Sequence, residues 1–157
     1  MNIPKESENV INFINNNLNS NLEQFLFSKD VSSRLFRKLY IEKNILVNGK
    51  FQRKGIILNK GDVVSLVLKQ EEENIEPEEM DLDIIYEDFD LLIINKEPNI
   101  VVHPTKSHQS NTLSNGIKHY FNKNRIYKKI RFVNRLDMNT SGIIIVAKNS
   151  FSHQQMA

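Results

Sequence analysis

The 157-residue sequence predicts an α+β protein, in which a small helix–hairpin domain is followed by a mixed-sheet domain. Residues 20–40 carry apolar side chains at helical spacing, whereas the second half of the chain contains short β-branched runs bounded by turns. A strongly acidic stretch around Pro77 separates the two parts. Because domains commonly span about 50 to 200 residues, we expect two small domains, over residues 10–69 and 83–157.

Composition narrows the class of protein. Hydrophobic residues make up 39% and charged residues 25%, as in ordinary globular proteins. No apolar run approaches the roughly 18 residues of a membrane span, and the first ten residues are polar, so we expect a cytoplasmic protein that does not enter the membrane. The chain has no cysteine, and its four histidines lack the spacing of a metal motif. We therefore expect no metal catalysis.

The charges are distributed unevenly behind a formal net charge of +2. Acidic residues gather in one stretch, and lysine and arginine dominate on both sides of it. Basic segments of this kind favour a polyanionic partner, although a basic surface by itself is more often a solvated face.

Two helices are predicted in the first domain. Ser20 and Glu23 have the spacing of a capping box, in which both side chains satisfy free amides at a helix start. A second helix is predicted to begin at Ser32 or Ser33, with apolar side chains on one side and arginine and lysine on the others. Such a helix can bury one stripe and offer the rest to phosphate groups.

A hairpin follows the second predicted helix. The pair Asn48-Gly49 separates two short apolar runs and supplies the positive backbone angles of a tight turn. Residues 59–62 are predicted to form another turn, which leads into a strand over residues 63–68.

Residues 70–82 are predicted to be an extended acidic linker. Seven acidic side chains surround Pro77, namely Glu71, Glu72, Glu73, Glu76, Glu78, Glu79 and Asp81. Like charges repel one another, so such a stretch is expected to pack poorly. The alternative is a solvated helix face, which would require Pro77 at a helix start.

The second domain is predicted to contain apolar runs or strands at residues 84–86, 91–94, 100–102 and 143–146, and a helix over residues 112–121. Thr112 or Ser114 is expected to cap that helix. Gly142 leads into the last strand, which is apolar enough to be buried on both faces.

The first domain resembles the RNA-binding domain named after ribosomal protein S-four of the small subunit. The resemblance covers residues 10–69 and is carried by Val31–Leu39, Ile45–Lys50 and Lys60–Val64. It implies that the basic second helix and the adjacent hairpin contact folded RNA through Ser33, Arg34, Arg37, Lys38, Asn48, Lys50, Arg53 and Lys54. Arginine and lysine suit this role because they track phosphates without reading bases. The alternative is a generic helix–hairpin module with a charged exterior.

Two stretches of the second domain resemble RluA-type RNA pseudouridine synthases. Residues 132–148 resemble the family signature, which reads His-Arg-Leu-Asp, two variable residues, Thr-Ser-Gly and an aliphatic strand ending in Ala-Lys. Residues 87–104 resemble the strand pair that opens the family's catalytic domain. One position departs from the pattern, because Asn134 stands where the family has histidine. We expect this change to alter local hydrogen bonding without abolishing the chemistry.

The resemblance implies roles for Asp137 and Arg135. Converting uridine to pseudouridine breaks the glycosidic bond, turns the base and rejoins it to the sugar through carbon, without metal or cofactor. Asp137 would act as the nucleophile or as the base that removes a sugar proton, and the sequence leaves both possibilities open. Arg135 would help to extrude the target uridine, a role suited to a planar cation. For Asp137 the alternative is an ordinary turn aspartate, and for Arg135 it is a surface phosphate contact or a simple ion pair.

Other residues and the length of the chain qualify this expectation. His103, which precedes Pro104, is expected to be structural rather than a second catalytic acid. RluA-type domains continue beyond the position of Ala157, with a tyrosine against the target base and a basic partner for the aspartate, so the resemblance implies a fragment or a natural truncation. Two functions therefore stay open: a synthase that acts on RNA, with ribosomal RNA as the expected substrate, and a catalytically incomplete RNA-binding protein derived from one.

Overall fold

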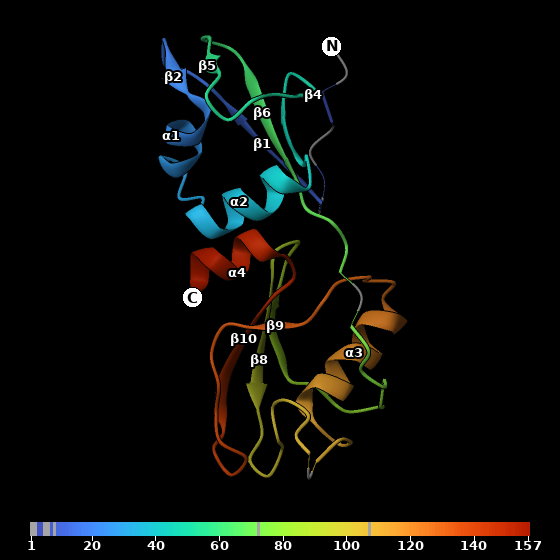
Figure 1. Cartoon of the computed structure of the whole chain (residues 1–157). Helices are drawn as coiled ribbons and strands as arrows, with labels where there is room; N and C mark the ends of the chain where they lie inside the picture. The colour runs from blue at the N-terminus through green and yellow to red at the C-terminus, as the bar shows by residue number, and fades with distance from the viewer. Residues whose placement is uncertain (1–2, 5–6, 8, 72, 107) are drawn as a thin grey trace. The chain divides into compact units, whose positions relative to one another are not determined.

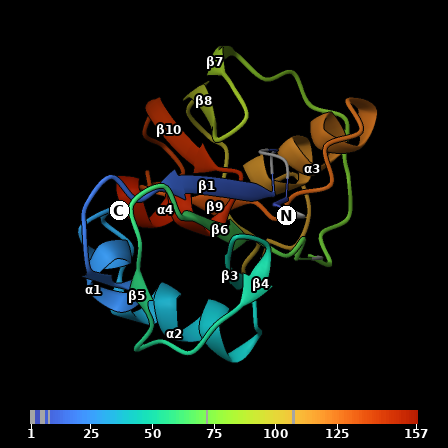
Figure 2. The ribbon, with the colours of Figure 1, turned by 90° about the horizontal axis from the view of Figure 1, so that it is seen from above.

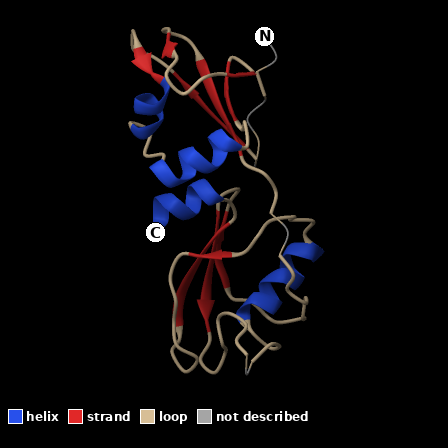
Figure 3. Ribbon diagram, in the orientation of Figure 1, coloured by secondary structure: helices blue, strands red, loops and turns tan. Residues whose placement is uncertain are grey.

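The computed structural model describes residues 3–4, 7, 9–71, 73–106 and 108–157 (Figure 1). The chain divides into two compact units, Met1–Lys69 and Gln70–Ala157. Each unit combines helices with its own antiparallel sheet (Figure 3), so the protein is α+β, as the sequence predicts. The strands described in the second unit pair antiparallel throughout, so the predicted mixed sheet is not found among them. None of the helices in the described ranges has the length and apolar character needed to cross a membrane.

The first unit contains, in chain order, β1 (Val10–Ile14), β2 (Ser20–Asn21), α1 (Leu22–Phe27), α2 (Ser33–Ile41), β3 (Ile45–Val47), β4 (Lys50–Phe51), β5 (Ile57–Leu58) and β6 (Val63–Val67). Strands pair in the order β1-β6-β3-β4, and β2 pairs with β5. The strand β1, which the sequence patterns do not predict, runs antiparallel along β6 from Val10 opposite Val67 to Ile14 opposite Val63 (Figure 2). The first strand of the sheet is therefore specified by a partner that is distant in the sequence.

One predicted cap is wrong, and one predicted helix start is confirmed. Asn21, not Ser20, caps α1, and its side-chain oxygen accepts hydrogen bonds from the amides of Glu23 and Gln24. Ser20 lies opposite Leu58 in the β2–β5 pair, so its backbone continues a strand rather than starting a helix. At α2 the prediction holds, because the Ser32 hydroxyl accepts from the Leu35 amide over 3.2 Å.

The predicted Asn48-Gly49 turn is confirmed. Both residues have positive φ, 51° for Asn48 and 79° for Gly49, as a two-residue hairpin between β3 and β4 requires. The Asn48 side chain also donates to the Asp62 carboxylate over 2.8 Å and accepts from the Val63 amide over 3.0 Å. These bonds attach the hairpin turn to the start of β6.

The second unit contains β7 (Ile84–Glu87), β8 (Leu91–Lys96), α3 (Leu113–Lys123), β9 (Arg131–Phe132), β10 (Gly142–Ala147) and α4 (Ser150–Met156). Its strands pair in the order β7-β8-β10-β9. Thr112 caps α3 in a capping box with Asn115, as predicted. Leu113, Ile117 and Phe121 repeat every four residues along α3, and their side chains pack with buried residues of β8 and β10.

One expectation for the apolar runs in the second unit is wrong. The strand at 143–146 is not buried on both faces, because Ile144 and Val146 face the α3 core while Ile143 is 46% exposed on the other face. The run at 100–102 forms no extended strand, since Val101 makes only one bridge, to Thr112. This bridge joins the run to Thr112, the N-cap residue of α3.

The described residues of the acidic segment, 70–71 and 73–82, form no helix or strand, but they do not lie free. Its first acids have basic or amide partners in the second unit. The Glu71 carboxylate lies 3.0 Å from Arg131 and 3.7 Å from Lys129. The Glu73 carboxylate accepts from the Ile130 amide over 3.0 Å. Glu72 lies outside the described residues. Self-repulsion is therefore offset locally by the basic stretch that precedes β9.

Apolar contacts also bind the acidic segment to the second unit. Ile75, Met80 and Leu82 pack against the core cluster formed by α3 and the sheet. Met80 lies over Gly116, where a Cβ would come within 2.9 Å of the Met80 Cβ. Three apolar side chains among the acids thus give the segment a packed side, which the count of charges alone does not reveal.

Candidate active site

Asp137 and Arg135 lie in the loop that joins β9 to β10, residues 133–141. The Asp137 carbonyl oxygen accepts from the Thr140 amide over 3.1 Å, which closes a turn over residues 137–140. Both side chains are exposed. Within the described residues, neither side chain makes a hydrogen bond or an ion pair. The carboxylate and the guanidinium are therefore available to a ligand.

Lys96, the last residue of β8, binds the backbone of this turn through its side chain. Its side chain is only 1% exposed. The ammonium donates to the carbonyl oxygens of Met138 over 3.1 Å and of Thr140 over 2.7 Å, and also to that of Glu97 over 2.8 Å. Burial lowers the pKa of Lys96, while the three oxygens complement its positive charge. The sequence pattern gives Lys96 no special role, because lysine in a strand is ordinarily exposed.

Asn134 attaches the beginning of the same loop to β10. Its side-chain amide donates to the Ile143 carbonyl over 2.8 Å, and its side-chain oxygen accepts from the Ile145 amide over 2.8 Å. The amide thus continues the β9–β10 ladder past Phe132.

Gly142 ends the loop with a φ of +139°. A Cβ at this position would lie 3.6 Å from the nearest Leu136 carbon, which is an ordinary contact. The backbone conformation, rather than a lack of space, therefore favours glycine here.

A second polar cluster holds the far end of β10 against the turn between β7 and β8. The Lys148 ammonium lies 2.6 Å from both the Glu87 carboxylate and the Asp88 carbonyl oxygen. The Tyr120 hydroxyl donates to the same Glu87 carboxylate, which raises the pKa of Tyr120 to about 12. Lys148 is the lysine of the Ala-Lys motif, and its contacts are structural.

His103 also has structural contacts, as expected. The Ser114 hydroxyl donates to the Val102 carbonyl over 3.0 Å, so the His103 Nδ1, 3.1 Å away, donates to the hydroxyl. The imidazole ring meets the Phe132 ring edge-on, with centroids 6.1 Å apart. His103 therefore supports β9.

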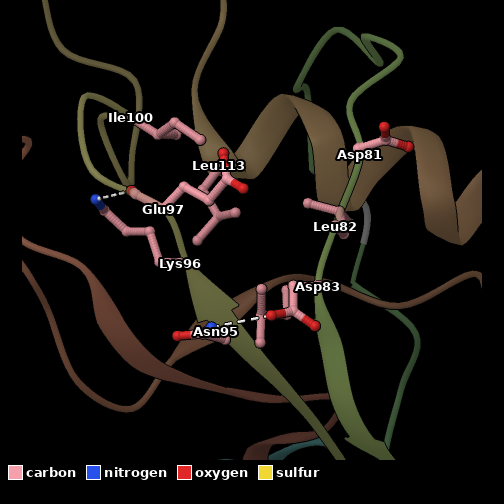
Figure 4. A pocket seen from close by; sticks show the side chains of 9 residues that line it. Asp81, Leu82, Asp83, Asn95, Lys96, Glu97, Ile100 and Leu113 are labelled. Carbon is pink, nitrogen blue, oxygen red and sulfur yellow. Dashed lines mark hydrogen bonds between the residues drawn. The ribbon is translucent and has the colours of Figure 1, made fainter.

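A pocket of about 230 Å³ lies at the end of β8 (Figure 4). It is lined by Asp81, Leu82, Asp83, Ile94, Asn95, Lys96, Glu97, Ile100 and Leu113. Asn95 donates to the Asp83 carboxylate over 2.9 Å, a bond that Figure 4 shows. Neither Asp137 nor Arg135 lines this pocket, and its carboxylates would repel a phosphate. Nor does any group of three or more histidine, aspartate or glutamate side chains suited to a metal occur in the described ranges.

The residues predicted to contact RNA lie on α2, on the β3–β4 hairpin and in the segment after β4. All of them except Asn48 are exposed: Ser33, Arg34, Arg37, Lys38, Lys50, Arg53 and Lys54. The side chain of Asn48 is already used within the turn. The Lys54 amide donates to the Tyr40 hydroxyl over 3.2 Å, which ties the segment after β4 to α2.

Comparison with known proteins matches residues 90–157 to the family described as RNA pseudouridylate synthase. The ribosomal large subunit pseudouridine synthase D of Buchnera aphidicola (subsp. Baizongia pistaciae) is 35% identical over 88% of this chain and 45% of its own length. The protein of the same name from Escherichia coli K12 is 34% identical over 85% of this chain and 42% of its own. An uncharacterized RNA pseudouridine synthase of Bacillus subtilis, YhcT, is 39% identical over 71% and 37%. The chain spans less than half the length of these relatives.

Proposed function

We propose that the chain, whose residues 90–157 match the RNA pseudouridylate synthase family, forms part of an enzyme that isomerises specific uridines in RNA to pseudouridine. The two relatives named synthase D carry names that refer to the large ribosomal subunit. Ribosomal RNA is therefore the proposed substrate, and the cytoplasm the proposed location.

The observation that carries this proposal is the exposed Asp137 carboxylate in a loop held from two sides. Lys96 binds the turn through two carbonyl oxygens, and Asn134 binds the start of the loop to β10. A carboxylate that attacks a sugar carbon, or removes a sugar proton, must be ionised and positioned before the substrate arrives. A buried lysine below the loop supplies that positioning without neutralising the carboxylate.

Arg135 is proposed to hold the opened RNA beside Asp137. It lies two residues before the aspartate in the same loop and is exposed. A guanidinium can stack on a base or bind a phosphate, and either contact would stabilise a uridine turned out of its helix.

Residues 10–69 are proposed to form a ribosomal-protein-S-four-like RNA-binding domain, and residues 83–157 the N-terminal part of the catalytic domain. The exposed cations on α2 and after β4 support RNA contact in the first, because they would neutralise phosphates and release counterions. In this proposal the acidic segment between them belongs with the catalytic part, to which its side chains are bound.

The test measures uridine isomerisation by the Asp137→Asn variant of the longest natural protein that contains this chain. Tritium carried on the uracil carbon that becomes bonded to the sugar is released only when the new bond forms. The variant keeps the size of the side chain and removes its charge, so release should fall by roughly a thousandfold or more while RNA binding persists. Asp81→Asn, in the acidic segment, is the matched control. Normal release by Asp137→Asn would refute the assignment, whereas binding without release in the wild-type protein would favour the RNA-binding alternative.

A further inference from the structure

Three aromatic rings lead from the core of the first unit to its surface. Phe36 is buried at 4% exposure, and its ring stacks on Tyr40 at a centroid distance of 5.8 Å and an angle of 11°. Tyr40 in turn meets Phe51 at 5.2 Å and 45°. Phe51, at the outer end, is 37% exposed. A large apolar ring thus stands partly in solvent with an aromatic support behind it.

The exposed ring is held in place by the surrounding backbone. Phe51 lies in β4 opposite Leu46 of β3, next to a turn that Asn48 attaches to β6. The Tyr40 ring is fixed in turn, because its hydroxyl accepts from the Lys54 amide over 3.2 Å. An ordered ring loses little conformational entropy when a flat ligand stacks on it.

Exposed cations lie close to Phe51 in the sequence. Lys50 precedes Phe51 in β4, and Arg53 and Lys54 follow it, all three exposed. Residues 43–61 contain five lysine or arginine residues and no acidic residue. On α2, Arg37 lies three residues before Tyr40, and therefore on the same side of the helix. An aromatic ring among exposed cations is the pattern of sites that bind unpaired nucleotides.

We propose that Phe51, supported by Tyr40, is a stacking site for one unpaired base of RNA, with Lys50, Arg53 and Lys54 on the flanking phosphates. The inference rests on the proposed RNA-binding function and narrows it to RNA that carries a bulged or looped-out nucleotide. A fully paired helix offers phosphates to the cations but keeps its base faces covered. Stacking on an aromatic side chain typically changes affinity by about 5- to 100-fold.

Two RNA hairpins of equal length test the site, one with a single bulged base and one fully paired. Wild-type chain should bind the bulged hairpin more tightly. Phe51→Leu keeps an apolar side chain but removes the ring, so affinity for the bulged hairpin should fall about 5- to 100-fold, while affinity for the paired one changes less than about twofold. Phe27→Leu is the matched control, because Phe27 is similarly exposed at 40% and its ring also packs on Phe36.

A Phe51→Trp variant tests the same site even where the Phe51→Leu variant does not fold. The chain has no tryptophan, so Phe51→Trp introduces a single fluorescent reporter at the site. Its emission should be quenched by the bulged hairpin and unchanged by the paired one, and a Phe27→Trp reporter should respond to neither.

Each contrary outcome identifies what has failed. If wild-type chain binds neither hairpin, the RNA-binding function and the stacking site both fall. If it binds both hairpins and Phe51→Leu weakens neither or both equally, RNA binding stands and the stacking site falls. If the emission of the Phe51→Trp variant changes with protein concentration in the absence of RNA, the ring serves a contact between copies, and the stacking site falls as well.

Discussion

The Lys96 ammonium donates to the Thr140 carbonyl oxygen over 2.7 Å, across 44 residues of sequence. The lysine ends β8, and the threonine closes the turn that begins at Asp137. The position of the proposed catalytic carboxylate therefore depends on a buried cation that does not contact it directly. Removal of this cation separates the effect of positioning from the effect of direct contact.

Lys96→Met should destabilise the second unit by about 2–4 kcal/mol, because it keeps the side-chain length but leaves three carbonyl oxygens without their shared donor. Urea unfolding monitored by circular dichroism measures this loss. Lys123→Met, at the exposed end of α3, is the control and should cost less than about 1 kcal/mol. Equal effects of the two substitutions would contradict the role assigned to Lys96.

Substitutions of Asn134 should separate the contribution of its side-chain donor to loop stability from that of its side-chain acceptor. Asn134→Leu loses both hydrogen bonds and should expose the Ile145 amide to faster hydrogen exchange. Asn134→Asp keeps an acceptor for that amide but turns a carboxylate oxygen toward the Ile143 carbonyl, so it should retain protection at Ile145 while losing about 1–2 kcal/mol of stability. Asn139→Leu, in the exposed turn, should leave exchange at Ile145 unchanged. Slow exchange in Asn134→Leu would show that the loop is held by other means.

Gly116→Ala should release the acidic segment. The new Cβ would lie 2.9 Å from the Met80 Cβ, so the segment rather than a flexible side-chain end must move, at a cost of about 1–3 kcal/mol. Limited proteolysis should then cut between Glu73 and Asp81 faster than in the wild-type chain. Gly55→Ala, with nothing within 4 Å of its Cβ, is the control. Rapid cleavage of the wild-type segment would instead favour the free linker that the charges predict.

Alkaline pH should destabilise the second unit through Tyr120. Its pKa is raised from 10.0 to about 12 by the hydrogen bond to Glu87, so the folded state holds this proton more tightly than the unfolded state does. The stabilisation is fully present below about pH 10 and is lost as the pH rises toward 12. Tyr120→Phe should lower stability by about 1–2 kcal/mol at neutral pH and flatten the decline above about pH 10. An unchanged pH profile in Tyr120→Phe would contradict this origin.

Arg34→Ala combined with Arg37→Ala should weaken RNA binding and reduce its salt dependence. Each lost phosphate contact removes about 0.7–0.9 from the slope of log affinity against log salt concentration, so the pair should reduce the slope by roughly 1.4–1.8. Glu79→Gln with Asp81→Asn, in the acidic segment, should have a smaller effect. Fluorescence anisotropy at several salt concentrations measures both. An unchanged slope in the arginine variant would place the RNA surface elsewhere.

Some of the fold could be read from short stretches of sequence. The Asn48-Gly49 turn, the Ser32 cap and the Thr112 cap all depend on backbone angles and side-chain bonds between near neighbours in the chain. Such features are encoded where they occur, because few residues satisfy the required geometry. The motif around Asp137 likewise identified the candidate site before its position in the fold was known.

The tertiary structure decided which residues support that site. Lys96 is the end of an ordinary strand in the sequence, and only the packing of β8 beneath the 137–140 turn makes it a buried donor. The charges of the acidic segment predict self-repulsion, but in the structure Arg131 and the core of the second unit pack against the segment. β1 forms a strand because its backbone pairs with β6. Burial and pairing depend on residues that are distant in sequence, so local composition could determine turns, caps and motifs but not the partners that hold them.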